Sequence, residues 1–195
     1  VEVQEAYAGD MVIFSGLPSV SIGETITDPK HVKALPPMTI EQPTLTMHFL
    51  VNDSPFSGRS GKFLTSRQIR ARLEKELETN VGLRVEPLEA MEGYKVSGRG
   101  ELHLSILLEK MRREGYELSV SKPEVLLKEI EGVIHEPFER VMITLQDAYA
   151  GTVITHMNTR QGIMQSMTSD AGYTKLEYLV PTRGLIGYRS QFINA

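Results

Sequence analysis

SGRGELHLSILLEKMRREG (residues 97–115) decides the fold class, because it predicts an amphipathic helix inside a strand-rich segment. Four apolar residues recur at i, i+3, i+4 and i+7 and form one buried face: Leu104, Leu107, Leu108 and Met111. Gly100 is expected to open this helix, and Gly115 to close it.

The segment around this helix, residues 44–123, predicts a complete ferredoxin-like domain. Residues 44–51 alternate as a strand, and Ser66 is expected to cap a first helix whose buried face is Ile69, Leu73 and Leu77. Short strands follow over 83–85 and 94–96, around a turn at Glu92-Gly93, and a last one over 116–120. The order βαββαβ is that of two helices on a four-stranded antiparallel sheet.

Residues 124–195 repeat most of this order. We expect a strand over 140–145, a helix over 148–158, a hairpin of 163–167 with 175–180, and a helix from Gly184. The order βαββα predicts a second ferredoxin-like sandwich that lacks its last strand. Such a sheet should present an unpaired edge.

The first 43 residues are interpreted as two parts. Strand signals over 1–4 and 10–14, with a turn at Gly16-Leu17-Pro18, indicate strands of an all-β domain, because about 30 residues cannot bury a core alone. Residues 29–43 are proline-rich and aperiodic, as in a linker. The predicted class is α+β, with domains over 1–28, 44–123 and 124–195 and a linker over 29–43.

The composition limits the chemistry. The 195 residues hold 21 Lys and Arg against 25 Asp and Glu, a net charge of −4, and no cysteine. A disulfide scaffold, a cysteine-ligated zinc, an iron–sulfur cluster and a thiol nucleophile are thereby excluded. No run approaches the roughly 20 apolar residues of a transmembrane helix, so we expect a soluble cytoplasmic protein without membrane contact.

The charge is distributed unevenly. Residues 1–43 hold two basic and six acidic side chains, residues 44–123 thirteen and eleven, and residues 124–195 six and eight. Between Asp53 and Glu74 there is no acid and five cations: Arg59, Lys62, Arg67, Arg70 and Arg72. This interval would attract an anion. A solvated helix face paired with the following glutamates is the open alternative.

The usual catalytic motifs fail in this sequence. Gly61-Lys62 is followed by Phe63, so a P-loop would lack the hydroxyl that holds magnesium. The third glycine of a dinucleotide fingerprint would fall at His103. The five histidines have no metal-ligand spacing, and no acid–base pair stands out. We therefore expect no catalytic residue and no metal site.

Two loops remain as candidates for recognition. Residues 52–62 form a long loop with an aromatic residue and basic residues, and residues 181–189 place cations around glycines at a helix start. Both suit contacts with phosphates rather than with base edges. Arg99 and the free amides at the start of the second helix could meet a phosphate, or glycines could serve only a tight turn there.

Several separated blocks resemble the translational GTPases. Residues 97–104 (SGRGELHL) are similar to a helix start in the third domain of elongation factor G and its relatives. Residues 52–63, 111–118 and 181–189 (PTRGLIGYR) resemble the TypA/BipA branch more closely. The resemblance covers essentially the whole chain.

The resemblance implies an assignment by segment. Residues 1–28 would be the last strands of the β-barrel domain II, residues 44–123 domain III, and residues 124–195 most of domain V. GTP and magnesium would belong to the G domain, which these residues do not contain, so no cofactor is expected in this chain. The parent would hydrolyse GTP. The implied partners are both ribosomal subunits, through RNA and protein, and the parent's own G domain, with no specific DNA.

The resemblance also implies site residues. Those that would face the G domain and the small subunit are Arg59, Lys62, Arg67, Arg70 and Arg99. Those that would face the large subunit are Arg160, Arg183 and Arg189. Contacts with the G domain or between domains would involve Gly98, Gly100, Glu101 and His103. The alternative function is a free-standing ferredoxin-like module that binds a small molecule at a sheet face or a domain interface.

Overall fold

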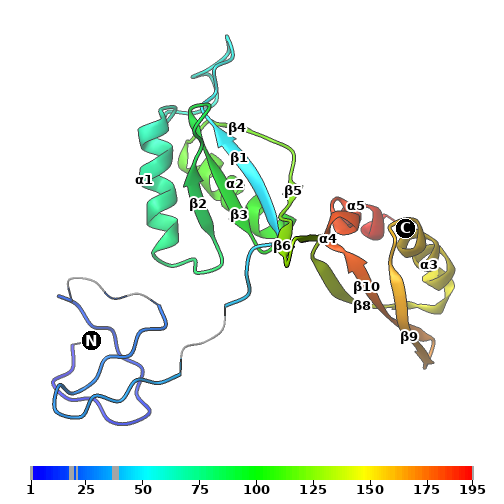
Figure 1. Ribbon diagram of the computed structural model, residues 1–195, viewed down its shortest axis with the longest axis horizontal. Helices are drawn as coiled ribbons and strands as arrows, with labels where there is room; N and C mark the ends of the chain where they lie inside the picture. The colour runs from blue at the N-terminus through cyan, green and yellow to red at the C-terminus, as the bar shows by residue number, and fades with distance from the viewer. Residues whose placement is uncertain (1, 18–19, 21, 37–39, 195) are drawn as a thin grey trace. The chain divides into compact units, whose positions relative to one another are not determined.

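The computed structural model describes residues 2–17, 20, 22–36 and 40–194. The chain divides into two compact units, residues 1–39 and residues 40–195. All helices and strands of the described residues lie in the second unit (Figure 1).

The first domain of that unit is the predicted sandwich. Its elements are β1 (Leu45–Leu50), α1 (Ser66–Leu77), β2 (Arg84–Pro87), β3 (Gly93–Gly98), α2 (Glu101–Glu114) and β4 (Ser119–Val120). The strands lie in the order β2-β3-β1-β4, with each neighbouring pair antiparallel. This is the ferredoxin-like arrangement, and the expected fold class is confirmed.

Both helices of this domain pack on one face of the sheet. The buried side chains come from alternate positions of β1 and β3 and from the predicted helix faces: Leu45, Met47, Phe49, Val96, Ile69, Leu73, Leu104, Leu107 and Met111. Each large apolar side chain buried in this way contributes about 1.5–3 kcal/mol.

Two helix ends follow from local chemistry. Thr65, and not Ser66, caps α1: its hydroxyl accepts the N–H of Gln68, and the Gln68 side chain accepts the N–H of Thr65. The reciprocal pair of a capping box favours Thr65 over its neighbour. Helix α2 ends as expected at Gly115, which has φ 96°.

The first sheet continues beyond residue 123, where the sequence had suggested a boundary. β5 (Glu124–Val125) pairs with β1, opposite Thr46 and Leu45. Pro123 has no N–H and interrupts the ladder, so the edge is divided into two short strands, β4 and β5. A hairpin that was not predicted follows, made of β6 (Lys128–Ile130) and β7 (Val133–His135).

The second domain has a three-stranded sheet in the part that the structure describes. Its elements are β8 (Phe138–Gln146), the 3-10 turn η1 (Asp147–Tyr149), α3 (Ala150–Thr159), β9 (Ile163–Asp170), β10 (Tyr173–Pro181), α4 (Thr182–Leu185) and α5 (Tyr188–Ile193). The order is β8-β10-β9, and β8 pairs with β10 alone among these strands. Val153 and Met157 of α3 pack on Leu176, Tyr178 and Val180 of β10.

Two details of the second domain differ from expectation. The helix predicted from 148 begins instead with η1, and the helix predicted from Gly184 is divided into α4 and α5. Gly187, the N-cap of α5, has φ 72°, a left-handed conformation that redirects the chain between the two helices. The hairpin turn was predicted correctly, since Ala171 and Gly172 have φ 49° and 82°.

The first unit contains no strand or helix among its described residues. Strands predicted over 1–4 and 10–14 are therefore wrong for residues 2–4 and 10–14, while Val1 and Pro18 lie outside the described residues. Met11 and Ile13 are fully exposed, so neither side chain of this apolar run is buried. Strands need partner strands, and a segment of this length supplies too few. Its assignment to a β-barrel stays a prediction.

Candidate nucleic-acid interface

The loop between β1 and α1 is organised around one carboxylate. Glu117, which lies between α2 and β4, accepts hydrogen bonds from the Asn52 side chain at 2.6 Å and from three backbone N–H groups of the loop. Those N–H groups belong to Gly58 at 3.0 Å, Ser60 at 2.8 Å and Gly61 at 2.9 Å. These bonds, that of Gly58 first, lower the pKa of Glu117. Glu117 therefore holds the loop on both sides of its tip, through Asn52 before it and through Gly58, Ser60 and Gly61 after it.

Glycines let the loop approach Glu117 closely. Gly58 has φ 88°, and a Cβ on Gly61 would lie 2.7 Å from the Cβ of Glu117. The N–H groups of Lys62 and Phe63 both donate to the carbonyl of Gly115, at 2.7 and 3.1 Å. The loop is therefore fastened to the C-terminal end of α2.

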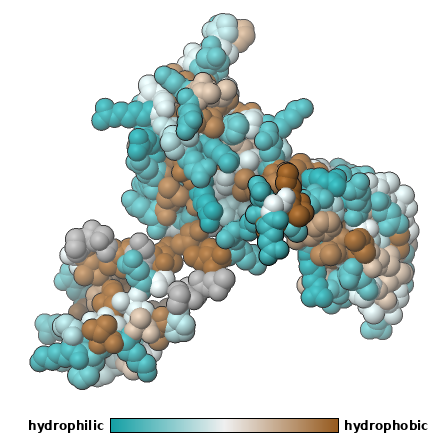
Figure 2. Space-filling model, in the orientation of Figure 1, coloured by the Kyte–Doolittle hydropathy of each residue, from teal (hydrophilic) through white to brown (hydrophobic). Residues whose placement is uncertain are grey.

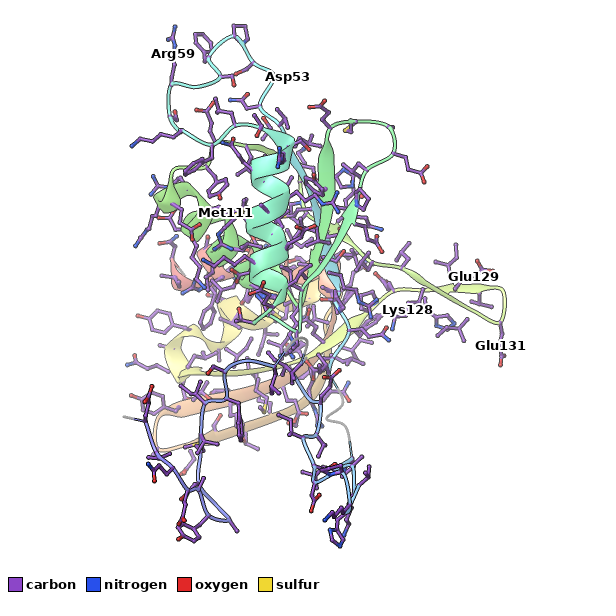
Figure 3. The ribbon with its side chains drawn as sticks, turned by 90° about the vertical axis from the view of Figure 1, so that its left-hand side faces the viewer. Asp53, Arg59, Met111, Lys128, Glu129 and Glu131 are labelled. Carbon is purple, nitrogen blue, oxygen red and sulfur yellow. The ribbon has the colours of Figure 1, made fainter. Side chains whose placement is uncertain are left out.

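The five cations of the basic interval fall into two groups. Arg59, Lys62 and Arg67 are not buried, and none has a carboxylate partner among the described residues. Figure 3 shows Arg59 at the end of the loop, together with Asp53. Arg70 pairs with Glu74 at 2.8 Å on the surface of α1.

Arg72 is the fifth cation, and its role is structural. Its side chain is 10% exposed and bonds Glu76 of α1 at 2.9 Å and Glu114 of α2 at 2.8 Å. The bond to Glu114 first, then that to Glu76, raises the pKa of Arg72 against the effect of burial. Arg72 thus joins the two helices and is unavailable to a partner. This agrees with the alternative that cations of this interval pair with the following glutamates.

The start of α2 brings together four of the predicted contact residues. Gly98 is buried, and a Cβ there would lie 2.9 Å from His103 Nδ1 and Leu104 Cδ2. Close packing therefore requires this glycine. Gly100, the N-cap, has φ −179° and open space around its Cβ position, so neither strain nor crowding requires glycine there. Arg99 is exposed beside them.

His103 is fixed by two hydrogen bonds. Its Nδ1 accepts the N–H of Arg99 at 3.3 Å, and its Nε2 faces the side-chain amide of Asn80, 2.8 Å from Nδ2 and 3.1 Å from Oδ1. Burial, followed by the charge of Arg99, lowers the pKa of His103. A neutral imidazole with both nitrogens engaged is suited to bracing the turn.

Glu101 lies at the junction of the two sandwich domains. Its carboxylate accepts the N–H of Gly187 at 2.8 Å, and Ile186 packs against the first core. A cleft of about 360 Å³ lies beside this contact, with Leu45, Leu102, Thr182 and Arg189 among its lining residues. Its size is that of a small-ligand pocket, and the alternative of a small-molecule module stays a prediction.

The three arginines predicted for the large subunit differ in availability. The guanidinium of Arg160 bonds the carbonyl of Gly184 at 2.5 Å and Gln191 at 2.8 Å, and lies 4.9 Å from the ring centroid of Tyr188. These bonds connect Arg160 to α4 and α5 and leave its guanidinium less available to a partner. Its contact with the large subunit stays a prediction. Arg183 pairs with Glu136 at 2.7 Å. Arg189 is exposed, with no carboxylate partner in the described part of the chain.

Sequence reasoning missed the β6–β7 hairpin as a surface feature. Three of its apolar side chains, Ile130, Val133 and Ile134, are more than half exposed, as is Leu127 directly before it. Figure 2 shows hydrophobic and hydrophilic side chains next to each other on it, and Figure 3 shows it projecting from the sheet. The signal was the dipeptide Glu131-Gly132 between Ile130 and Val133-Ile134. The φ values of Glu131 and Gly132, 53° and 78°, make a hairpin turn.

The described residues contain no cluster of three or more His, Asp or Glu side chains that could hold a metal ion. No described helix is long and apolar enough to cross a membrane. What the first domain offers is an anchored loop with cations directed to solvent, which is suited to binding an anionic surface.

Comparison with known proteins relates this chain to a family. A model of the elongation factor G C-terminus matches residues 133–195. The large ribosomal subunit assembly factor BipA of Bacillus subtilis (strain 168) is 51% identical over 195 residues, which is 100% of this chain and 32% of that protein. The chain belongs to the TypA/BipA family. The resemblance to this family over essentially the whole chain is thereby confirmed.

A second relative of the TypA/BipA family gives the same result. The large ribosomal subunit assembly factor BipA of Salmonella typhimurium (strain LT2) is 49% identical over 189 residues, 96% of this chain and 31% of that protein. The chain thus spans about a third of the length of these curated relatives. A crystal structure from Thermus thermophilus matches 77% of this chain and 38% of its own, at 14% identity and a TM-score of 0.43, and nothing further follows from it.

Proposed function

We propose that this chain is a ribosome-binding, non-catalytic part of a TypA/BipA-type translational GTPase. The observation that carries the proposal is the loop 52–62, which Glu117 holds in place while Arg59 and Lys62 remain open to solvent. The related proteins are named as assembly factors of the large ribosomal subunit. A ribosome presents a dense array of phosphates to such a surface.

Charge placement supports the proposal. Arg67 lies in the first turn of α1, and that turn holds no acid. A cation at the positive end of a helix costs about 0.3–1 kcal/mol, so its presence suggests a use outside the fold. An anionic partner at this end would supply the missing counter-charge.

The proposal gives the other predicted residues unequal weight. Arg99 and Arg189 are exposed and suited to phosphates, whereas Arg70 and Arg183 already have carboxylate partners. In the parent, the G domain would hold GTP and magnesium and would be coupled through the first domain. The turn of Gly98, Gly100 and His103 is where we place that coupling.

Ribosome co-sedimentation tests the proposal. We expect the variant Arg59→Glu/Lys62→Glu/Arg67→Glu to lose about tenfold or more in affinity at low salt. The matched control Arg84→Glu/Lys128→Glu/Lys175→Glu makes the same charge change at exposed cations elsewhere and should lose little. Equal losses in the two variants would reduce the effect to net charge and contradict the proposed site.

A further inference from the structure

The tip of the loop carries an exposed aromatic ring with a guanidinium over it. Phe56 is 61% exposed, and the Arg59 guanidinium carbon lies 4.7 Å from its ring centroid. Phe56 does not belong to the buried core of the first domain, so packing in that core does not explain an aromatic ring at this position. A phenylalanine left in water on a surface loop costs free energy that a partner can recover.

The tip is organised in advance. The N–H of Ser57 donates to the carbonyl of Ser54 at 3.0 Å, and that of Arg59 to the carbonyl of Phe56 at 3.3 Å. Gly58, between the ring and the arginine, is held by Glu117 at 3.0 Å. Because two turns and an anchored glycine define the backbone, a partner would meet Phe56 and Arg59 with little ordering left to do.

We infer that Phe56 and Arg59 form a stacking platform for an unpaired nucleobase of an RNA, with Lys62 and Arg67 on the flanking phosphates. The inference rests on the proposed ribosome-binding function and names the chemistry of that same site. Unpaired RNA bases stack on aromatic rings and on guanidinium planes, and this loop places both together.

An acidic peptide fits the tip less well than a base. The neighbours of Phe56 are Pro55 and Ser57. Neither carries a long apolar side chain that would enclose a peptide side chain beside the ring. A flat π surface accepts any base, whatever its sequence.

Fluorescence anisotropy with the 195-residue chain tests the inference. The probes are a single-stranded RNA decamer, an abasic oligonucleotide with the same number of phosphates, and a glutamate-rich decapeptide. We expect the RNA to bind about 5- to 100-fold more tightly than the abasic chain, since stacking contributes about that factor for each base. Phe56→Leu should abolish this preference, Phe56→Tyr should retain it, and the control Phe138→Leu, at an exposed phenylalanine of β8, should leave it unchanged.

Three results would overturn the platform. Equal affinity for RNA and the abasic chain would show that phosphates alone are recognised. A preference for RNA that persists in Phe56→Leu would show that the base does not stack on the ring, and tighter binding of the acidic peptide would show a protein contact. Any of these results, with ribosome affinity still lost in the triple cation variant, would leave the proposed function intact. If the cation variant also kept its ribosome affinity, the proposed function would fail as well.

Discussion

Glu117 shows how one side chain can order a whole loop. Its two oxygens receive four hydrogen bonds, three of them from backbone N–H groups at Gly58, Ser60 and Gly61. A carboxamide at this position could accept at one oxygen only. We therefore expect Glu117→Gln to release the loop while the sheet and helices persist.

Hydrogen exchange measures this prediction directly. Protection of the amides of Gly58, Ser60 and Gly61 should fall in Glu117→Gln, and it should stay unchanged in the matched variant Glu89→Gln, an exposed glutamate on another loop. Unaltered protection in Glu117→Gln would show that the loop holds its form without the carboxylate.

The same residue predicts an acid transition of the loop. The folded pKa of Glu117 is below the ordinary value of 4.5, so its contribution to stability is complete above pH 4.5. That contribution is lost as the pH falls through the folded pKa, because the carboxyl must then take up a proton. Amide protection in the loop should therefore decline below pH 4.5 in the native chain and show a much weaker decline in Glu117→Gln.

At the scale of elements, the turn from β3 into α2 makes a paired prediction about two glycines. Gly98→Ala should destabilise the fold by about 1–3 kcal/mol, because the new methyl group would meet His103 and Leu104. Gly100→Ala should cost less than about 1 kcal/mol, since only a modest N-cap preference is lost. Urea unfolding measures the loss of unfolding free energy in each variant. Equal losses would contradict the claim that close packing requires glycine at position 98.

The contact between α1 and α2 makes a second paired prediction. Arg72→Ala leaves Glu76 and Glu114 without their common partner and should cost about 1.5–3 kcal/mol. Arg70→Ala breaks an exposed pair on the same helix and should destabilise the fold much less, because water screens that pair. Thermal unfolding of the two variants compares the two losses of unfolding free energy. A loss for Arg72→Ala as small as that for Arg70→Ala would contradict the claim that Arg72 stabilises the contact between α1 and α2.

Elements with a buried face could be predicted from the sequence. The spacing of Ile69 and Leu73, and of Leu104, Leu107 and Met111, placed both helices because burial imposes the period. The β6–β7 hairpin was missed since all residues of its two short strands are exposed and no alternation marks them. The division of the sheet edge into β4 and β5 was not predictable, because it depends on the pairing of both strands with β1, far earlier in the chain.

The candidate site was predictable in position but not in detail. The basic interval identified the loop, yet the anchoring role of Glu117 leaves no sequence signal, since its bonding partners are mostly backbone N–H groups. Arg160 and Arg189 look alike in sequence, but the guanidinium of Arg160 bonds a carbonyl 24 residues away. Whether an arginine is free depends on such long-range contacts.

At the scale of the unit formed by residues 40–195, two sandwich domains share a junction at Glu101 and Gly187. The net charge of −4 says little about the partners of the chain. Its cations differ in availability: within the described residues Arg59, Lys62 and Arg67 have no carboxylate partner, while Arg70, Arg72 and Arg183 are neutralised within the fold. Local charge governs binding rather than the total, because exposed charges more than about 10 Å apart are largely screened by salt.

The salt dependence of ribosome binding tests the central claim most directly. Each cation–phosphate contact contributes about 0.7–0.9 to the slope of log affinity against log salt. For the variant with Arg59, Lys62 and Arg67 changed to glutamate, we expect the magnitude of this slope to be smaller than that of the unmodified chain by about 2 to 3. For the control at Arg84, Lys128 and Lys175, we expect the slope of the unmodified chain. Identical slopes for the unmodified chain and the loop variant would contradict the claim that this loop meets the phosphates of the ribosome.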